Sequence, residues 1–121
     1  MYRILFVEDE SALQKTFSDL LTGEGYEVIC ALNGEEGLKM AKEEKPDLIL
    51  LDLILPKMHG FEVLKRIKMD DAIKEIPVII LTNLESMKDV DRAIELGART
   101  YLVKTQYSLD EVLEKIKRVL G

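Results

Sequence analysis

Short runs of consecutive apolar residues alternate along the chain with segments in which apolar residues recur every three or four positions. The first pattern predicts strands that are buried on both faces, and the second predicts amphipathic helices. Strands covered on both faces are typical of parallel sheets, in which a helix connects each strand to the next. The predicted strands are residues 3–7, 26–31, 47–52, 77–82 and 100–104.

The helical segments that follow these runs carry recognisable capping residues. Asn33 followed by Glu36, and Ser108 followed by Glu111, have the spacing of an N-cap residue and its reciprocal partner. Gly97 follows the apolar stripe of the fourth helix, and we expect it to end that helix in a left-handed conformation.

Five strand–helix units in strict alternation predict an α/β fold, a single doubly wound three-layer sandwich around a five-stranded parallel sheet. A length of 121 residues fits one domain, so we expect residues 1–121 to form a single unit. Ligands of such sheets bind beyond the carboxyl ends of the strands, where the strand order reverses. A functional site is therefore expected at those ends.

Composition excludes several classes of function. The net charge of −6 argues against direct binding of nucleic acid by this domain. The single cysteine, Cys30, cannot form an internal disulfide, and it is interpreted as a small buried residue in a reduced compartment. The apolar run from Ile4 to Val7 is too short for a signal peptide or a membrane span. We therefore expect a cytoplasmic protein without a membrane partner.

Asp52 is unusual because it lies within the apolar stretch DLILLDLILP, where an unpartnered carboxylate would be costly. Polar residues also follow the first, fourth and fifth strands, and neighbouring strand ends bring such groups together. The residues at these ends are Glu8, Asp9, Glu10, Asp52, Thr82 and Lys104.

The acids at this edge would repel one another unless a cation intervened. Lys104 can pair with Asp52, and a divalent metal can bind the carboxylates. Hard oxygen ligands without histidine or cysteine favour Mg²⁺. A magnesium site next to a threonine and a lysine indicates phosphoryl transfer, in which positioning and charge neutralisation dominate.

The segments VEDE (7–10), DLILP (52–56) with Gly60, LT (81–82) and LVK (102–104) resemble, in this order and spacing, the receiver domain of two-component response regulators. The resemblance covers the whole chain. It implies a flavodoxin-like sheet with strand order 2-1-3-4-5. It also implies a signalling switch that catalyses only its own phosphorylation and dephosphorylation, and is not an enzyme in the usual sense.

The resemblance assigns roles to individual residues. Asp52 would be the phosphoacceptor, receiving a phosphoryl group from the phosphohistidine of a sensor histidine kinase or a phosphotransfer protein. Asp9, Asp52 and the backbone carbonyl of Ile54 would hold Mg²⁺, with Mn²⁺ as a substitute, and Glu8 would act through water. Thr82 would bind the phosphoryl oxygens.

Lys104 shares the phosphoryl-binding role with Thr82, and Thr82 with Tyr101 would form the switch. Its output would be a changed surface on the fourth helix, fifth strand and fifth helix, which binds an effector protein or output domain and allows a phosphorylation-dependent homodimer. Ile54 and Leu84, two residues beyond Asp52 and Thr82, would tune the rate of dephosphorylation.

Each of these residues also has a plainer interpretation. Asp52 alone would be a strand-terminal cap, and Glu8 with Asp9 would suit the dipole at the start of a helix. Tyr101 would be a half-buried strand residue, and His59 a surface-loop residue. The combination of sites at one edge favours the chemical interpretation.

Two positions depart from the family pattern. Thr105 stands where the family usually has a proline, often after a cis bond. A trans bond is therefore expected here, and the sequence does not fix the direction in which the Lys104 side chain points. Asn83 replaces the usual alanine or glycine, and its larger side chain would affect access to the phosphoryl group.

Other functions fit less well. A haloacid-dehalogenase-type phosphatase needs a second aspartate two residues after the first, where this chain has Ile54. A flavodoxin needs a loop rich in serine, threonine and glycine after the first strand, where this chain has the acidic segment EDESA. The remaining alternative is a phosphorylation-independent docking or dimerisation module with the same fold.

Overall fold

The structure is a computed structural model that describes residues 1–121. Its centre is a five-stranded parallel sheet in the order β2-β1-β3-β4-β5, which confirms the predicted topology. The order reverses between β1 and β3, as expected for a doubly wound sheet. The strands are β1 (Arg3–Val7), β2 (Glu27–Ala31), β3 (Leu48–Leu51), β4 (Val78–Thr82) and β5 (Thr100–Val103).

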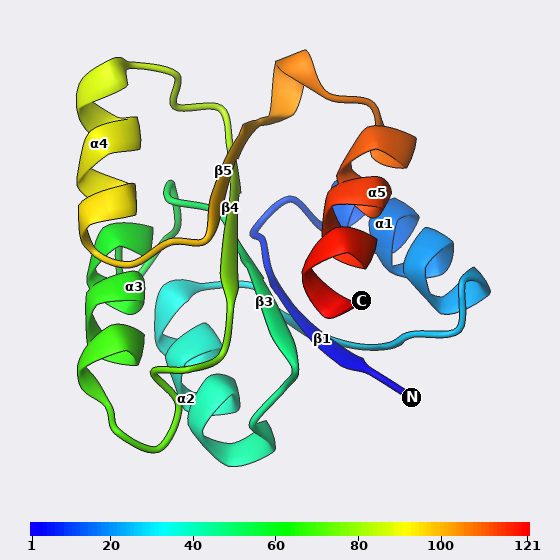
Figure 1. Ribbon diagram of the computed structural model, residues 1–121, viewed down its shortest axis with the longest axis horizontal. Helices are drawn as coiled ribbons and strands as arrows, with labels where there is room; N and C mark the ends of the chain where they lie inside the picture. The colour runs from blue at the N-terminus through cyan, green and yellow to red at the C-terminus, as the bar shows by residue number, and fades with distance from the viewer.

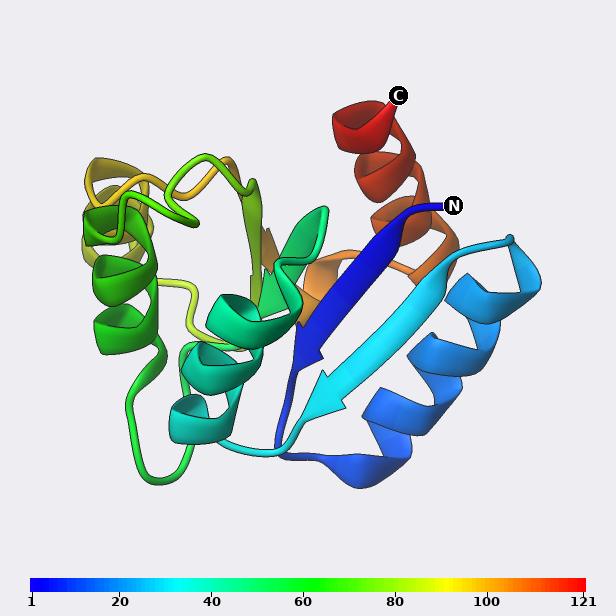
Figure 2. The same ribbon diagram turned by 90° about the horizontal axis from the view of Figure 1, so that it is seen from below.

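Helices cover both faces of this sheet (Figures 1 and 2). Helices α2, α3 and α4 lie on one face, and α1 and α5 lie on the other, so the three-layer sandwich is confirmed. None of the helices is both long and apolar enough to cross a membrane. The helices are α1 (Ser11–Gly23), α2 (Gly34–Glu44), α3 (Gly60–Met69), α4 (Met87–Glu95) and α5 (Leu109–Leu120), with a short 3₁₀ helix η1 (Lys104–Gln106).

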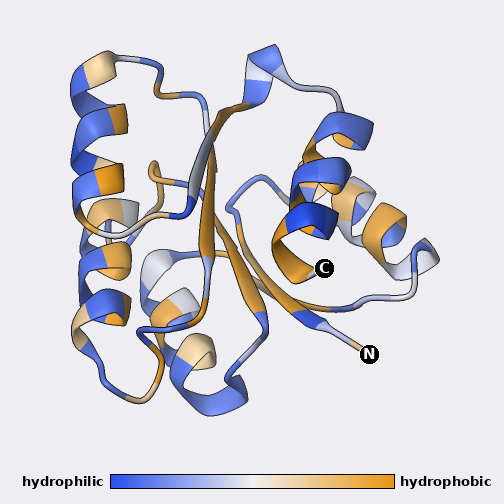
Figure 3. Cartoon of the chain, in the orientation of Figure 1, coloured by the Kyte–Doolittle hydropathy of each residue, from blue (hydrophilic) through white to orange (hydrophobic).

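Alternate residues of the strands feed two separate hydrophobic cores. Ile4 and Phe6 of β1 pack with α1 and α5, whereas Leu5 and Val7 pack with α2, α3 and α4. All residues of β3 are buried, which explains why that strand is apolar at consecutive positions. The hydropathy pattern is visible in Figure 3, in which the strands are largely hydrophobic and the outer helix faces hydrophilic.

Most of the predicted caps are present. The N–H of Glu36 donates to Asn33 Oδ1, although the Glu36 side chain returns no bond to Asn33. Ser108 and Glu111 form both halves of a capping box. Gly97 has a φ of +109°, so the left-handed end of α4 is confirmed. Glu10 occupies the N-cap position of α1, but its side chain forms no capping hydrogen bond.

Candidate functional site

Asp52 lies directly after β3, at the carboxyl edge of the sheet, and is only 4% exposed. Its backbone N–H donates to the carbonyl of Val7, the last residue of β1, over 3.1 Å. The Ile54 N–H donates in turn to Asp52 Oδ1, also over 3.1 Å. These two bonds hold the carboxylate at the point where the strand order reverses.

Lys104 reaches this carboxylate from the end of β5. Its Nζ donates to Asp52 Oδ2 over 2.8 Å and lies 2.5 Å from Glu8 Oε1. Burial by itself lowers the pKa of Lys104, but the bonds to Asp52 and Glu8 outweigh burial, so its pKa is raised. The lysine is therefore a permanent ammonium between two carboxylates.

Glu8 is fully buried, and its Oε2 accepts the backbone N–H of Glu10 over 3.1 Å. Its Oε1 has no hydrogen-bond partner of good geometry, so the short contact with Lys104 is an ion pair whose hydrogen-bonding angle is poor. Burial raises the pKa of Glu8 and the nearby Asp52 adds to this, while Lys104 offsets part of it. Glu8 is thus a buried carboxylate beside Asp52, paired with Lys104.

Asp9 completes a cluster of acids at this edge. Glu8, Asp9 and Asp52 each offer one carboxylate oxygen, and these oxygens lie within 4.8 Å of one another. Asp9 is exposed, so the cluster opens to solvent on that side. The all-oxygen donor set fits a hard divalent cation such as Mg²⁺.

A second group of predicted residues meets at the end of β4. Thr82 is fully buried, and its Oγ1 accepts a long bond of 3.5 Å from the N–H of Leu84. The Tyr101 hydroxyl donates to the carbonyl of Leu84 over 2.7 Å. Burial, with smaller effects of Asp89 and Asp52, raises the pKa of Tyr101 to about 12. The structure therefore joins Thr82 and Tyr101 through the backbone of Leu84.

The two departures from the family pattern leave the site intact. The chain has no cis peptide bond, so Lys104 and Thr105 are joined in trans. The short helix η1 begins at Lys104, and from there its side chain still reaches Asp52. Asn83 is exposed beside the buried Thr82. Ile54, two residues beyond Asp52, is 50% exposed.

A sequence profile described as the response regulator receiver domain matches residues 4–117. The chain belongs to this family. It is 41% identical to the polar-differentiation response regulator DivK of Brucella anthropi over 118 residues, covering 98% of this chain and 95% of that protein. It is 38% identical to the DNA-binding dual master transcriptional regulator RpaA of Synechocystis, but covers only 49% of that longer protein.

Solved receiver domains share the fold closely. A CheY-like receiver domain protein from Methanospirillum hungatei superposes with a TM-score of 0.92 at 32% identity, covering 99% of this chain and 94% of that one. The chemotaxis protein CheY4 of Vibrio cholerae has a TM-score of 0.91 at 32% identity, covering 99% of both chains. The predicted family and its flavodoxin-like strand order are thereby confirmed.

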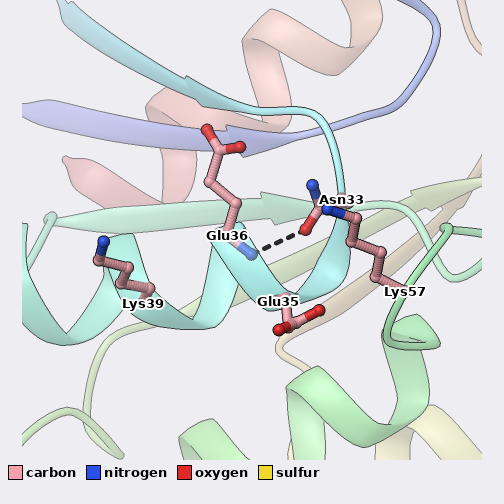
Figure 4. Close-up of a pocket in the computed structure, with 5 residues that line it drawn as sticks. All are labelled: Asn33, Glu35, Glu36, Lys39 and Lys57. Carbon is pink, nitrogen blue, oxygen red and sulfur yellow. Dashed lines mark hydrogen bonds between the residues drawn. The ribbon is translucent and has the colours of Figure 1, made fainter.

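A polar hollow of about 370 Å³ lies on the surface of this receiver domain, near the start of α2 (Figure 4). Figure 4 shows the Asn33 cap of α2 beside Lys57, which comes from the loop after β3. None of the acids of the cluster lines this hollow. The lining residues are Asn33, Glu35, Glu36, Lys39 and Lys57.

Two features of the site were not predicted. The sequence predicts a pair between Lys104 and Asp52 alone, whereas the structure adds the contact with Glu8. The sequence also predicts that His59 is an ordinary surface-loop residue. His59 is exposed, but its Nδ1 accepts the N–H of Phe61 and caps α3. Its place one residue before Gly60, directly ahead of the first apolar residues of α3, was the available signal.

Proposed function

We propose that this receiver domain, residues 1–121, is a phosphoacceptor switch. Asp52 receives a phosphoryl group from the phosphohistidine of a sensor histidine kinase or a phosphotransfer protein. The observation that carries the proposal is the position of Asp52, buried at the switch point of the sheet and paired over 2.8 Å with the ammonium of Lys104. A purely structural capping role needs neither this buried lysine nor the adjacent acids.

The transfer forms one bond and breaks one. A carboxylate oxygen of Asp52 forms a new P–O bond while the P–N bond of the donor breaks, and the electron pair of that bond stays on the imidazole nitrogen. Lys104 and the Thr82 hydroxyl would bind oxygens of the transferred group. The domain acts only on itself, so later hydrolysis of the acyl phosphate returns it to its starting state.

Asp9, Asp52 and the backbone carbonyl of Ile54 would hold Mg²⁺ directly, or Mn²⁺ in its place, and Glu8 would act through water. The bound metal would neutralise the clustered carboxylates and the phosphoryl charge. The carboxylate donor set supports this assignment.

The signal would leave the site through Thr82 and Tyr101. A phosphoryl group that draws Thr82 inward would move the backbone at Leu84, to which the Tyr101 hydroxyl is bonded. The affected surface would be formed by α4, β5 and α5. Its apolar side chains include Met87, which is 70% exposed, and Ile94, which is 48% exposed. An effector protein, an output domain or a second copy would bind this surface in the cytoplasm.

Phosphorylation by a small donor tests the proposal directly. The protein is incubated with Mg²⁺ and acetyl phosphate, and its intact mass is measured. We expect one added phosphoryl group in the native protein and none in Asp52→Asn. Asp47→Asn is the matched control, because Asp47 lies exposed before the other end of β3 and should leave phosphorylation unchanged.

Two results would contradict the proposal. An unmodified native protein in the presence of Mg²⁺ would favour the phosphorylation-independent docking module. An adduct that survives in Asp52→Asn would place the phosphoacceptor elsewhere. Omission of Mg²⁺, with excess chelator, should reduce the rate of phosphorylation strongly, and an unchanged rate would exclude the metal assignment.

A further inference from the structure

Helix α4 is held to the rest of the domain by few buried side chains. Ala93 is its only buried residue, whereas α3 buries Gly60, Phe61, Val63, Leu64 and Ile67. A helix with so little buried surface is easily displaced, since burial is the main force that fixes it. The remaining contacts of α4 with its neighbours therefore have a large effect on its position.

Arg92 makes one such contact. Its guanidinium carbon lies 4.1 Å from the centroid of the Phe61 ring. The guanidinium takes part in none of the ion pairs or side-chain hydrogen bonds of the structure. Its contact with Phe61 is a cation–π interaction between α4 and the first turn of α3.

Phe61 is in turn fixed to the loop that follows Asp52. Its N–H donates to His59 Nδ1 over 3.3 Å, and the two rings are nearly parallel, at 4° with centroids 5.5 Å apart. Gly60 packs so closely that an added Cβ would lie 2.3 Å from the carbonyl oxygen of Asp52. The Gly60 N–H also donates to the carbonyl of Leu53 over 2.9 Å. Contacts thus run without a gap from Asp52 to Arg92.

We propose that Arg92 is a positioning residue that couples helix α4 to the loop following Asp52, through its cation–π contact with Phe61. The coupling deepens the proposed function, on which it rests, because it adds a second route from the loaded site to α4. This route runs over α3 and is separate from the path through Thr82 and Tyr101.

The first test uses beryllofluoride with Mg²⁺ as the phosphoryl mimic and follows backbone amide chemical shifts. Loading of native protein should shift amides near Asp52 and along α4. Arg92→Gln should retain the shifts near Asp52 but lose a large part of those along α4. Arg92→Lys keeps the cation and should restore them. Arg99→Gln removes the same charge from the turn after α4, makes no ring contact, and should behave as the native protein.

Equal α4 responses in Arg92→Gln and native protein would overturn the coupling, as would an equal loss in Arg99→Gln. Failure of the native protein to load would contradict the proposed function instead. A second measurement, amide hydrogen exchange without any mimic, tests the coupling in either case. Arg92→Gln should speed amide exchange in α4 about two- to fivefold, the ratio that corresponds to the free energy of an exposed cation–π contact.

His59→Ala, which removes the cap and the stacked ring beside Phe61, should also speed exchange in α4. The double variant should exchange no faster than Arg92→Gln alone, because the path from His59 to α4 is already broken. Effects that multiply in the double variant would show that the two residues act independently, and would overturn the proposal.

Discussion

Lys104 Nζ donates a 2.8 Å hydrogen bond to Asp52 Oδ2, so the lysine proposed to bind the phosphoryl group already neutralises its acceptor before phosphorylation. The same ammonium contacts Glu8, and both carboxylates are almost completely buried. Coulomb attraction in this low-dielectric setting offsets the cost of removing three charges from water. The resting state of the site thus depends on one cation.

Replacement of that cation should be costly. In Lys104→Met, Glu8 and Asp52 would face each other as buried acids without a counter-ion. We expect the free energy of unfolding at pH 7 to fall by about 2–4 kcal/mol, near the cost of breaking a buried ion pair. Chemical denaturation measures the loss. Added Mg²⁺ should restore part of it, because a cation among the carboxylates again separates them.

Lys117→Met is the matched control, since Lys117 pairs with Glu24 over 2.7 Å at a half-exposed position. Its effect should be far smaller than that of Lys104→Met, because solvent screens surface ion pairs. Equal losses in the two variants would show that Lys104 is an ordinary surface lysine. A Lys104→Met variant that Mg²⁺ does not stabilise would contradict the metal assignment.

Ile54 should keep the phosphorylated form long-lived. Its half-exposed side chain lies two residues beyond Asp52 and cannot orient a water molecule, and the same holds for Leu84 beyond Thr82. Ile54→Asn or Ile54→Glu should shorten the half-life of phospho-Asp52 about tenfold or more, because a polar side chain there can position the attacking water. Loss of the phosphoryl group over time is followed by intact mass.

Leu32→Asn provides the control for Ile54. Leu32 is exposed to a similar degree, 47% against 50%, but follows the edge strand β2. The half-life of phospho-Asp52 in Leu32→Asn should equal that in the native protein. An unchanged half-life in both Ile54 variants would contradict the prediction. It would indicate that access of water to the phosphoryl group, and not orientation of the water, determines the rate of hydrolysis.

The sheet and the cluster at its edge were predictable because they depend on local patterns. Consecutive apolar residues in β3 require cover on both faces, which leads to the doubly wound fold. Once the strands are parallel, the residues that follow them lie at one edge of the sheet, so Glu8, Asp52 and Lys104 belong to the same edge. The arrangement needed no knowledge of side-chain conformation.

Contacts that depend on side-chain conformation were not predictable in the same way. The ion pair between Lys104 and Glu8 depends on how the Lys104 side chain extends from the start of η1. The contact of Arg92 with Phe61 joins two helices whose spacing is set by the core. Periodicity assigns each residue to a face, but it does not say which side chains touch across two faces.

Gly34 should tolerate no side chain. A Cβ built on Gly34 would lie 1.9 Å from the carbonyl oxygen of Met58, in the loop between β3 and α3. The Gly34 N–H also donates to the carbonyl of Pro56 over 3.2 Å, so this loop cannot move away without losing a bond. Gly34→Ala should lower the free energy of unfolding by about 1–3 kcal/mol, measured by denaturation.

Gly23→Ala is the comparison for Gly34→Ala, because a Cβ at Gly23 would meet nothing within 4 Å and the residue ends α1. That substitution should be neutral or should stabilise the protein by about 0.4–1 kcal/mol, through lower entropy of the unfolded chain. Equal losses in the two variants would show that the close approach of α2 to the loop is not the cause.

Tyr101 should show a delayed ionisation that depends on its place beside Leu84. Burial raises its pKa from 10.0 to about 12, and ionisation would remove the donor of its 2.7 Å bond. Since the pKa in the folded state exceeds that of the unfolded chain, the stabilisation is complete below pH 10 and is lost as the pH rises towards 12.

The phenolate absorbance difference between native protein and Tyr101→Phe should have its midpoint near 12. Over the same pH range the native protein should lose stability relative to Tyr101→Phe, which cannot ionise. A midpoint near 10 would mean that the ring is solvated and that the bond to Leu84 is absent in solution.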